Sequence, residues 1–286
     1  MASVLLTGAT GFIGAHLLAK LKDRRHTVIS VGHGDGDVAT PATWTAFPAA
    51  EIVIHLAGKT FVPESWADPQ GFTQTNLNGT IGALEYCRRH QSRLVFISSY
   101  LYGVPRSLPI AEDAAVHPNN PYAMSKKLAE DACRFYADFH GVPVTILRPF
   151  NVYGPGQNKR FLIPSIVDQV IAGQPLKILD LEPRRDYLYV DDLTEAFARA
   201  IDQPQGFVIM NVASGTSHSV AEVIATVQRL AGTDLPVISE GHRRAQEVMD
   251  TRADITRARE VLGWTPRWSL ESGLAALIEY GRAAAR

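Results

Sequence analysis

The sequence has few cysteines and no excess of positive charge. Cys87 and Cys133 are the two cysteines among 286 residues, and both stand far apart in segments of helical character. We therefore expect neither a disulfide framework nor a metal site. The 28 Lys and Arg residues are balanced by 29 Asp and Glu, for a formal net charge of −1, and no polybasic run occurs. This balance argues against nucleic-acid and membrane-surface partners.

Long apolar runs are also missing. No stretch approaches the ~20 apolar residues that span a bilayer. The first residues enter a strand pattern without the basic and apolar regions of a secretory signal, so we expect a cytoplasmic protein. The length allows a sizeable core, in one large domain or in a domain with a smaller appendage.

A glycine-rich turn near the start organises the chain. Residues 3–7 are a short apolar run typical of a buried strand, residues 7–14 read TGATGFIG, and residues 15–22 have the apolar rhythm of a helix. A turn without β-carbons lets the backbone approach a ligand closely, and the helix N-terminus favours a pyrophosphate. The pattern indicates a dinucleotide site; the alternative is a glycine-rich turn without a ligand.

Strand and helix patterns alternate through the first half, which is typical of a parallel sheet covered by helices on both faces. Between Val31 and Glu51 the pattern is poor, and a third strand is expected to be reduced or missing. Strands are expected at 3–7, 28–31, 51–57, 94–98 and 142–147, and helices at 15–22, 77–90 and from 121 onward.

The second half is less regular. Asp191 or Asp192 is expected to cap the helix that ends near Ile201. The other expected elements are a turn-rich segment at 151–157, helices at 163–172, 219–230 and from 270, and strands at 176–179 and 207–212. We expect a dinucleotide-binding domain of residues 1–152 and 186–212, a smaller discontinuous domain of residues 153–185 and 213–286, and a ligand cleft between them.

Tyr122 and Lys126 are candidates for acid–base chemistry. Pro121 suits the first turn of a helix, so the two side chains, four residues apart, share one face. A nearby ammonium favours the phenolate of a tyrosine, whose ordinary pKa is ~10. Tyr122 then suits proton exchange with a hydroxyl or carbonyl during hydride transfer. Ser98 and Ser99 end a strand, where ligands bind in open α/β sheets. The alternatives are a solvated helix face and ordinary strand-end serines.

These motifs together resemble the extended short-chain dehydrogenase/reductases, an NAD-dependent epimerase/dehydratase family, in its nucleotide-sugar branch. That branch includes 4-epimerases, 4,6-dehydratases and 4-keto reductases. The resemblance runs in order along nearly the whole chain and implies a Rossmann-type doubly wound fold with a C-terminal substrate domain. It rests on TGATGFIG, HLAG at 55–58, NLNGT at 76–80, SSYLYG at 98–103, YAMSK at 122–126, RPFNVYGPGQ at 148–157, RDYLYVDD at 185–192 and LGWTP at 262–266.

The resemblance implies roles for individual residues. Tyr122 would be the catalytic acid/base, Lys126 would lower its pKa and bind the nicotinamide ribose, and Ser99 or Ser98 would be the hydroxyl partner. Asn151, Arg185 and Arg244 would bind the nucleotide-diphosphate sugar, because arginine forks suit a diphosphate; a surface ion pair is the alternative for either arginine. The cofactor would be bordered by Gly8, Gly11, Phe12, Ile13, Gly14, His33, Asp37, Val38, Leu56, Ala57, Gly58, Asn76 and Pro149.

Two departures from the family pattern bear on the reaction. Gly32 stands where NAD-preferring relatives carry an acidic residue, so NAD and NADP both stay open. The alternatives are that Asp35 reaches the ribose of NAD or that His33 neighbours the 2′-phosphate of NADP. Tyr100 and Leu101 stand where 4,6-dehydratases carry Asp-Glu, which disfavours dehydration.

The pattern is most similar to GDP-6-deoxy-4-keto-hexose reductases, with a sugar 4-epimerase as the alternative. A reductase of a non-sugar carbonyl and a non-catalytic cofactor-binding regulator are the further rivals. The resemblance also implies a homodimer, paired through the Tyr122 helix and the preceding helix. The apolar side chains of Leu128, Ala132, Phe135 and Phe139 fit this pairing, and they fit packing within one chain as well.

Overall fold

The centre of the protein is a parallel sheet of six strands in the order β10-β5-β4-β3-β1-β2. The computed structural model describes residues 1–202, 206–241 and 247–284. The chain leaves β1 toward β2 on one side and then builds outward from β3 on the other, so β1 and β3 mark the switch point where ligands bind in such sheets. The strands are β1 (Ser3–Thr7), β2 (Thr27–Val31), β3 (Ile52–His55), β4 (Arg93–Ile97), β5 (Val144–Pro149) and β10 (Phe207–Val212).

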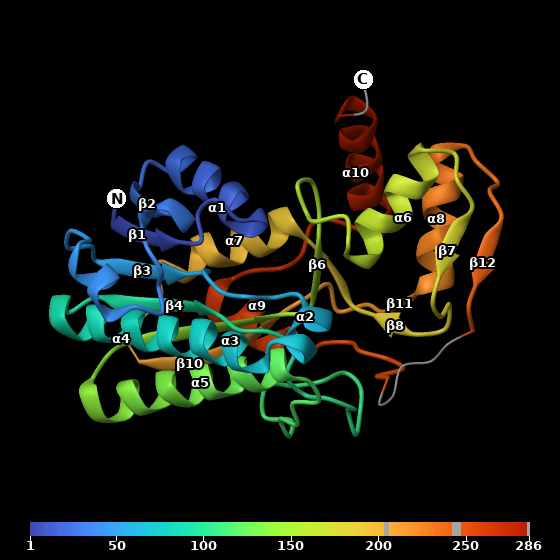
Figure 1. Ribbon diagram of the computed structural model, residues 1–286. Helices are drawn as coiled ribbons and strands as arrows, with labels where there is room; N and C mark the ends of the chain where they lie inside the picture. Colours follow the sequence, from blue (N-terminus) through green and yellow to red (C-terminus); the bar gives the residue numbers. More distant parts are fainter. Residues whose placement is uncertain (203–205, 242–246, 285–286) are drawn as a thin grey trace.

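Helices cover both faces of the sheet, as the alternating pattern predicts (Figure 1). On one face α1 (Phe12–Asp23) packs against α7 (Val190–Ala200), with α9 (Thr256–Leu262) beside α7 and β10. On the other face lie α3 (Pro69–Thr73), α4 (Gly79–His90) and α5 (Pro121–His140), preceded by the short α2 (Val62–Ala67). Each face has its own buried apolar cluster, so the strands are buried on both sides and need no polar alternation.

The segment between Val31 and Glu51 forms two short 3₁₀ turns, η1 (His33–Asp35) and η2 (Pro41–Thr45). Within this fully described segment no strand occurs, which confirms the prediction of a missing strand. Trp44 fills the space instead: its side chain is buried, and its indole N–H donates to the Val38 carbonyl at 2.8 Å.

A second lobe stands beside the sheet (Figure 1) and holds the third apolar cluster. In it α6 (Leu162–Ile171), α8 (Val220–Ala231) and α10 (Leu270–Ala284) pack together. Three two-stranded pairs complete it: β7 (Leu176–Ile178) with β12 (Val237–Ser239), β8 (Arg184–Arg185) with β11 (His218–Ser219), and β6 (Asn151–Tyr153) with β9 (Tyr187–Tyr189). The expected residue ranges of the two domains stay a prediction.

Two expectations for the second half are wrong. Residues 151–153 are not a turn but β6, because they pair in parallel with β9 from a distant part of the chain. Helix α7 begins at Val190 with Tyr189 as N-cap, so neither Asp191 nor Asp192 caps it. The Asp192 carboxylate instead accepts the backbone N–H groups of Arg267 and Trp268, both at 3.0 Å.

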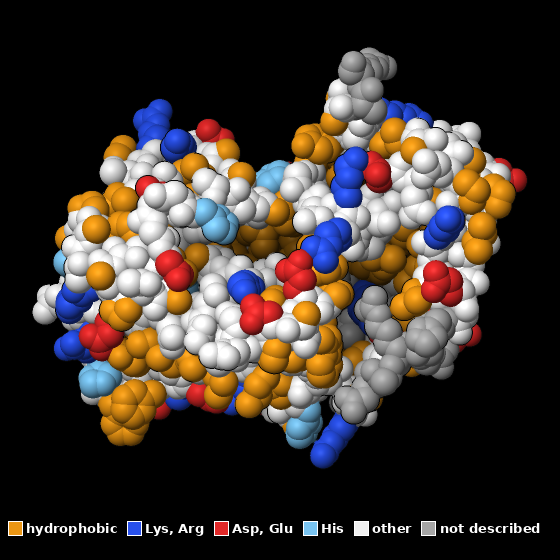
Figure 2. Space-filling view, in the orientation of Figure 1, with side chains coloured by type: hydrophobic (Ala, Val, Ile, Leu, Met, Phe, Trp, Pro, Cys, Tyr) orange, Lys and Arg blue, Asp and Glu red, His pale blue; other side chains and the backbone are white. Residues whose placement is uncertain are grey.

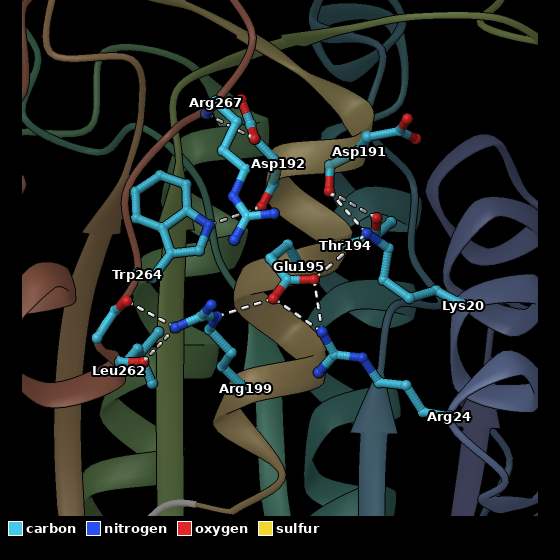
Figure 3. Close-up of polar contacts among 11 residues, drawn as sticks. Lys20, Arg24, Asp191, Asp192, Thr194, Glu195, Arg199, Leu262, Trp264 and Arg267 are labelled. Atoms are coloured by element: carbon cyan, nitrogen blue, oxygen red, sulfur yellow. Dashed lines mark hydrogen bonds and ion pairs between the residues drawn. The ribbon is translucent and has the colours of Figure 1, made fainter.

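Helix α7 joins distant segments of the chain through the polar side chains of Asp192 and Glu195 (Figure 3). Glu195 accepts hydrogen bonds from Arg24 of α1 at 2.6 and 2.8 Å and from Arg199 at 2.8 Å. Arg199 in turn donates to the carbonyls of Leu262 and Gly263. These contacts fix α1, and with it the glycine turn, to the C-terminal part of the chain.

The described part of the chain holds neither a membrane-spanning helix nor a cluster of metal ligands. Across 1–202, 206–241 and 247–284, none of the helices has both the length and the apolar character that a membrane crossing requires. In the same part of the chain, no group of three or more His, Cys, Asp or Glu side chains is placed to bind a metal ion.

Candidate functional site

The turn after β1 has no room for a side chain at Gly8 or at Gly14. A β-carbon on Gly14 would lie 2.0 Å from the Gly8 carbonyl oxygen, and one on Gly8, whose φ is +72°, would lie 2.8 Å from the Ala57 amide nitrogen. Gly11 is the N-cap of α1 and has no side chain to cap the helix, and the first turn holds no acidic residue. The free N–H groups at the start of α1 can therefore bind an anion. This cradle fits a dinucleotide pyrophosphate, in which Phe12 and Ile13 would offer backbone N–H groups.

The segment after β3 is fixed against the turn and against α5. Asn76 stands in a π-helical turn, η3 (Gln74–Asn78), and its side chain is buried. Its amide oxygen accepts the Lys59 N–H at 2.9 Å, and its amide nitrogen donates to the Ser125 hydroxyl at 2.8 Å. A β-carbon on Gly58 would lie 2.6 Å from that amide oxygen. Asn76 therefore positions the backbone of Leu56, Ala57 and Gly58 beside the Tyr122 helix.

Tyr122 and Ser99 come together at the carboxyl end of β4. Tyr122 is half-buried, and its ring packs edge-on against Phe72, with ring centroids 6.4 Å apart. Ser99 is the serine whose hydroxyl lies close enough to the phenol to lower its pKa. The Ser98 hydroxyl is buried and has no hydrogen-bond partner among the described residues. The geometry therefore favours Ser99 over Ser98 as the partner of Tyr122.

Lys126 lies one helical turn after Tyr122 and is 2% exposed. Its ammonium donates to the Ile97 carbonyl at 3.0 Å and stands 4.7 Å from the centre of the Phe96 ring. Burial lowers its pKa to about 8, against a smaller opposing influence of Cys133 and Glu130. A β-carbon on Gly58 would be 3.7 Å from the ammonium, so Lys126 borders the same space as the segment after β3.

The ionisation of Tyr122 differs from the expectation that Lys126 holds its pKa down. Burial raises the pKa of Tyr122 above its usual range, and the group that lowers it is the Ser99 hydroxyl. The physical reason is that removal of water penalises the phenolate, while the Lys126 ammonium turns to the Ile97 carbonyl instead. In this structure the phenol therefore carries its proton at neutral pH.

The other expected cofactor residues stand around this centre. Pro149 ends β5, next to the end of β4 in the sheet. Val38 is buried. Asp37 is exposed, and its carboxylate accepts a hydrogen bond from the Ala39 N–H at 2.9 Å. His33 is exposed in η1, and none of the described contacts joins it to Tyr122, Ser99 or Lys126.

On the side of the second lobe, Asn151 begins β6 and its side-chain amide lies 3.4 Å from the Asp186 carbonyl. Arg185 lies close enough to Tyr100, the residue after Ser99, for its charge to lower the pKa of that phenol against the larger raising effect of burial. Its guanidinium is held by the Glu247 carboxylate and donates to the Val248 carbonyl at 2.5 Å. Arg244 lies outside the described residues.

Sequence reasoning missed several residues at the site. Glu247, the partner of Arg185, is 62 residues away from it, although it stands in the same Arg-x-x-Glu-Val stretch that drew attention to Arg244. Arg160 forms an ion pair with Glu64 at 2.6 Å, and its guanidinium lies 3.9 Å from the centre of the Phe61 ring. These contacts join the segments after β3 and β6, and nothing in the sequence pattern links the two. Figure 2 shows the surface hollowed between the two lobes.

A parallel sheet whose first strand ends in a glycine turn at the switch point defines a Rossmann-type, doubly wound α/β protein. Comparison with known families is specific: the model of the NAD dependent epimerase/dehydratase family matches residues 4–213. The chain belongs to this family.

Individual relatives cover almost the whole chain. A GDP-6-deoxy-D-mannose reductase of Pseudomonas aeruginosa is 33% identical, over 96% of this chain and 95% of its own length. A UDP-glucose 4-epimerase of Mycolicibacterium smegmatis is 32% identical, over 97% and 98%. Among solved structures, RMD from P. aeruginosa complexed with NADPH has a TM-score of 0.92 at 31% identity, covering 99% of this chain and 100% of that one. A UDP-glucose 4-epimerase of Thermotoga maritima with UDP-glucose has a TM-score of 0.94 at 27% identity, with the same coverage.

Proposed function

We propose that this protein is an NAD(P)-dependent oxidoreductase that acts at C4 of a nucleotide-diphosphate sugar, as a 4-keto-6-deoxy-sugar reductase. The observation that carries the proposal is the pairing of Tyr122 with Ser99 beside Lys126, next to a glycine turn that fits a pyrophosphate. Similarity to a GDP-6-deoxy-D-mannose reductase supports the reaction, and relatives solved with NADPH or NAD support the cofactor class.

The residues of the chain suit the proton half of such a reduction. A reduced nicotinamide, when bound in the glycine turn, would supply the hydride for the C4 carbon. Ser99 donates a hydrogen bond to the C4 oxygen and holds it against Tyr122, whose phenol is protonated at neutral pH. Tyr122 gives this proton to the oxygen as the carbonyl becomes an alcohol. For Lys126 to stabilise the phenolate that is left, its ammonium would have to turn from the Ile97 carbonyl toward Tyr122.

A 4-epimerase is the second candidate, because relatives of both kinds match the chain at similar identity. An epimerase needs the same three side chains but must oxidise before it reduces. Dehydration has less support: Leu101 is fully buried, and the Tyr100 hydroxyl donates to the Gly103 carbonyl at 2.5 Å. Neither residue offers the carboxylate that removal of water across C5 and C6 requires.

The experiment that tests the function is a panel of nucleotide sugars and their 4-keto forms. Each compound is incubated with NADH and with NADPH, and the products are identified by NMR. We expect a 4-keto-6-deoxy sugar to be reduced at C4 with consumption of one reduced coenzyme per turnover. Interconversion of C4 epimers without net coenzyme consumption would identify an epimerase instead.

The two serines provide a matched pair of variants. Ser99→Ala is expected to lower kcat about 10-fold to 100-fold, because a hydrogen bond to a group that becomes charged is lost. Ser98→Ala removes a hydroxyl that has no partner among the described residues, so kcat is expected to stay within about 3-fold of the wild type. Steady-state rates at saturating coenzyme measure both. The opposite ranking would assign the role to Ser98.

The remaining expectations belong to this proposal. The substrate would lie between the lobes, near Arg185 and Asn151, with residues 1–152 and 186–212 holding the coenzyme. Binding of a diphosphate to Arg185 requires a rearrangement, since the Arg185 guanidinium now forms an ion pair with the Glu247 carboxylate. We place the enzyme in the cytoplasm, where such coenzymes are available.

We also propose a homodimer that pairs through α5. Phe135 and Phe139 of this helix are 51% and 73% exposed, with ring centroids 5.0 Å apart. Figure 2 shows hydrophobic side chains gathered at the lower left, over the end of α5. A second copy of the chain, whose α5 offers the same apolar face, would cover them.

The double variant Phe135→Ser/Phe139→Ser is expected to be monomeric by light scattering at concentrations where the wild type is dimeric. Tyr280→Ser, which changes a similarly exposed aromatic residue on α10, is the control and is expected to leave the mass unchanged. A monomeric wild type would contradict the proposal.

A further inference from the structure

The end of β2 approaches the glycine turn without an acidic side chain. The Ala9 amide donates to the Val31 carbonyl at 3.1 Å, so the two segments are in contact. A β-carbon on Gly32 would lie 2.6 Å from the Thr10 methyl carbon and 2.9 Å from its hydroxyl oxygen. The threonine therefore occupies the direction in which a side chain at position 32 would point.

A carboxylate from three residues later reaches the backbone of Gly32 instead. The η1 turn brings the Asp35 amide to the Gly32 carbonyl at 3.2 Å and the Asp35 carboxylate to the Gly32 amide at 2.8 Å. The Oδ2 oxygen makes this second bond, and Oδ1 has no hydrogen-bond partner among the described residues. Asp35 is exposed, so its negative charge and a free acceptor stand at Gly32, the residue that lies against Thr10 of the glycine turn.

Cations are scarce around this carboxylate. From Thr27 to Gly58 the sequence holds no lysine or arginine. Proteins that bind the 2′-phosphate of NADP commonly use an arginine there, whereas a carboxylate accepts from the free 2′-hydroxyl of NAD and repels the phosphate. His33, two residues before Asp35, is able to carry positive charge, and it too is exposed.

We infer that Asp35 makes this protein select NAD(H) over NADP(H), with the η1 turn replacing the missing acidic residue at the end of β2. The inference rests on the proposed function, since it requires a dinucleotide in the glycine turn. It adds to that function a coenzyme choice and a specificity-determining residue.

Binding of the two coenzymes to the purified protein tests the inference without any substrate. NADH and NADPH are titrated separately and followed by nicotinamide fluorescence and by calorimetry. We expect NADH to bind at least about 10-fold more tightly, because a fixed like charge beside the 2′-phosphate is costly. Equal binding, or tighter binding of NADPH, would overturn the inference, whereas binding of neither would contradict the proposed function itself.

Three variants identify the residue responsible. Asp35→Asn keeps an oxygen that accepts the Gly32 N–H but removes the charge, and is expected to bring the affinity ratio to within about 3-fold of unity. Asp35→Arg is expected to reverse the preference. Asp23→Asn, which changes an exposed carboxylate at the end of α1, is the control and should leave the ratio unchanged. A ratio that responds to Asp23 and not to Asp35 would overturn the assignment.

Discussion

Replacing Tyr122 with phenylalanine is expected to lower kcat by about 10²-fold to 10⁴-fold, the range that a positioned proton donor contributes. The ring packs edge-on against Phe72, and phenylalanine keeps this contact while losing the hydroxyl that meets Ser99. The variant is therefore expected to fold and to bind coenzyme like the wild type. Single-turnover rates and a fluorescence titration of the coenzyme measure the two effects separately.

A second tyrosine of α5 supplies the control. The Tyr136 hydroxyl donates to the Glu85 carboxylate at 2.7 Å, far from the serines at the end of β4. Tyr136→Phe removes the same atom from the same helix and is expected to leave kcat within about 2-fold. If Tyr122→Phe retained near-normal turnover, the acid–base assignment would be refuted, whatever the substrate.

The parts of the site that local sequence determines were predictable. A glycine spacing between a strand and a helix has few structural solutions, and the turn at Gly8 and Gly14 has the close backbone contacts it implies. The start of α5 follows likewise from Asn120 and Pro121, because the asparagine caps the Ala123 N–H and proline suits the first turn.

Contacts between distant segments were not predictable from spacing. The sequence leaves Ser98 and Ser99 open, because adjacent residues at a strand end differ only in the direction that the chain then takes. Arg185 has the planar guanidinium, with its paired N–H donors, that suits a diphosphate. Its pairing with Glu247, however, joins segments 62 residues apart, which spacing does not predict. The same holds for Asn151, whose strand exists through pairing with β9.

The ionisation of Tyr122 shows a further limit. Spacing places an ammonium one turn away and suggests a lowered pKa, but it carries no information on burial. In the structure, burial raises the pKa of Tyr122 and lowers that of Lys126 to about 8. Desolvation acts on both groups in the direction of their neutral forms, which prepares the phenol to give a proton rather than to take one.

A buried ion pair joins α5, the helix that carries Tyr122, to the sheet. Arg148 of β5 donates to both carboxylate oxygens of Glu130 on α5, at 2.9 and 2.6 Å, and their side chains are 4% and 5% exposed. Arg148 also donates to the Tyr102 hydroxyl at 2.9 Å, which donates to Asn211 of β10 at 2.7 Å. The network thus joins α5, β5 and β10 with the loop that follows Ser99.

Glu130→Gln is expected to destabilise the protein by about 3–5 kcal/mol, because it leaves the Arg148 guanidinium buried without its counter-charge. A fall in Tm of about 10 °C would accompany this loss.

Asp131→Asn is the neighbouring control: Asp131 pairs with Lys127 on the solvent side of α5, and an exposed pair of this kind contributes about 0.5 kcal/mol or less. The double variant Glu130→Leu/Arg148→Met should recover much of the loss, since apolar side chains carry no desolvation penalty. Calorimetric unfolding of the three variants separates the explanations, because equal losses from Glu130→Gln and Asp131→Asn would show that the buried charge is not what the fold depends on.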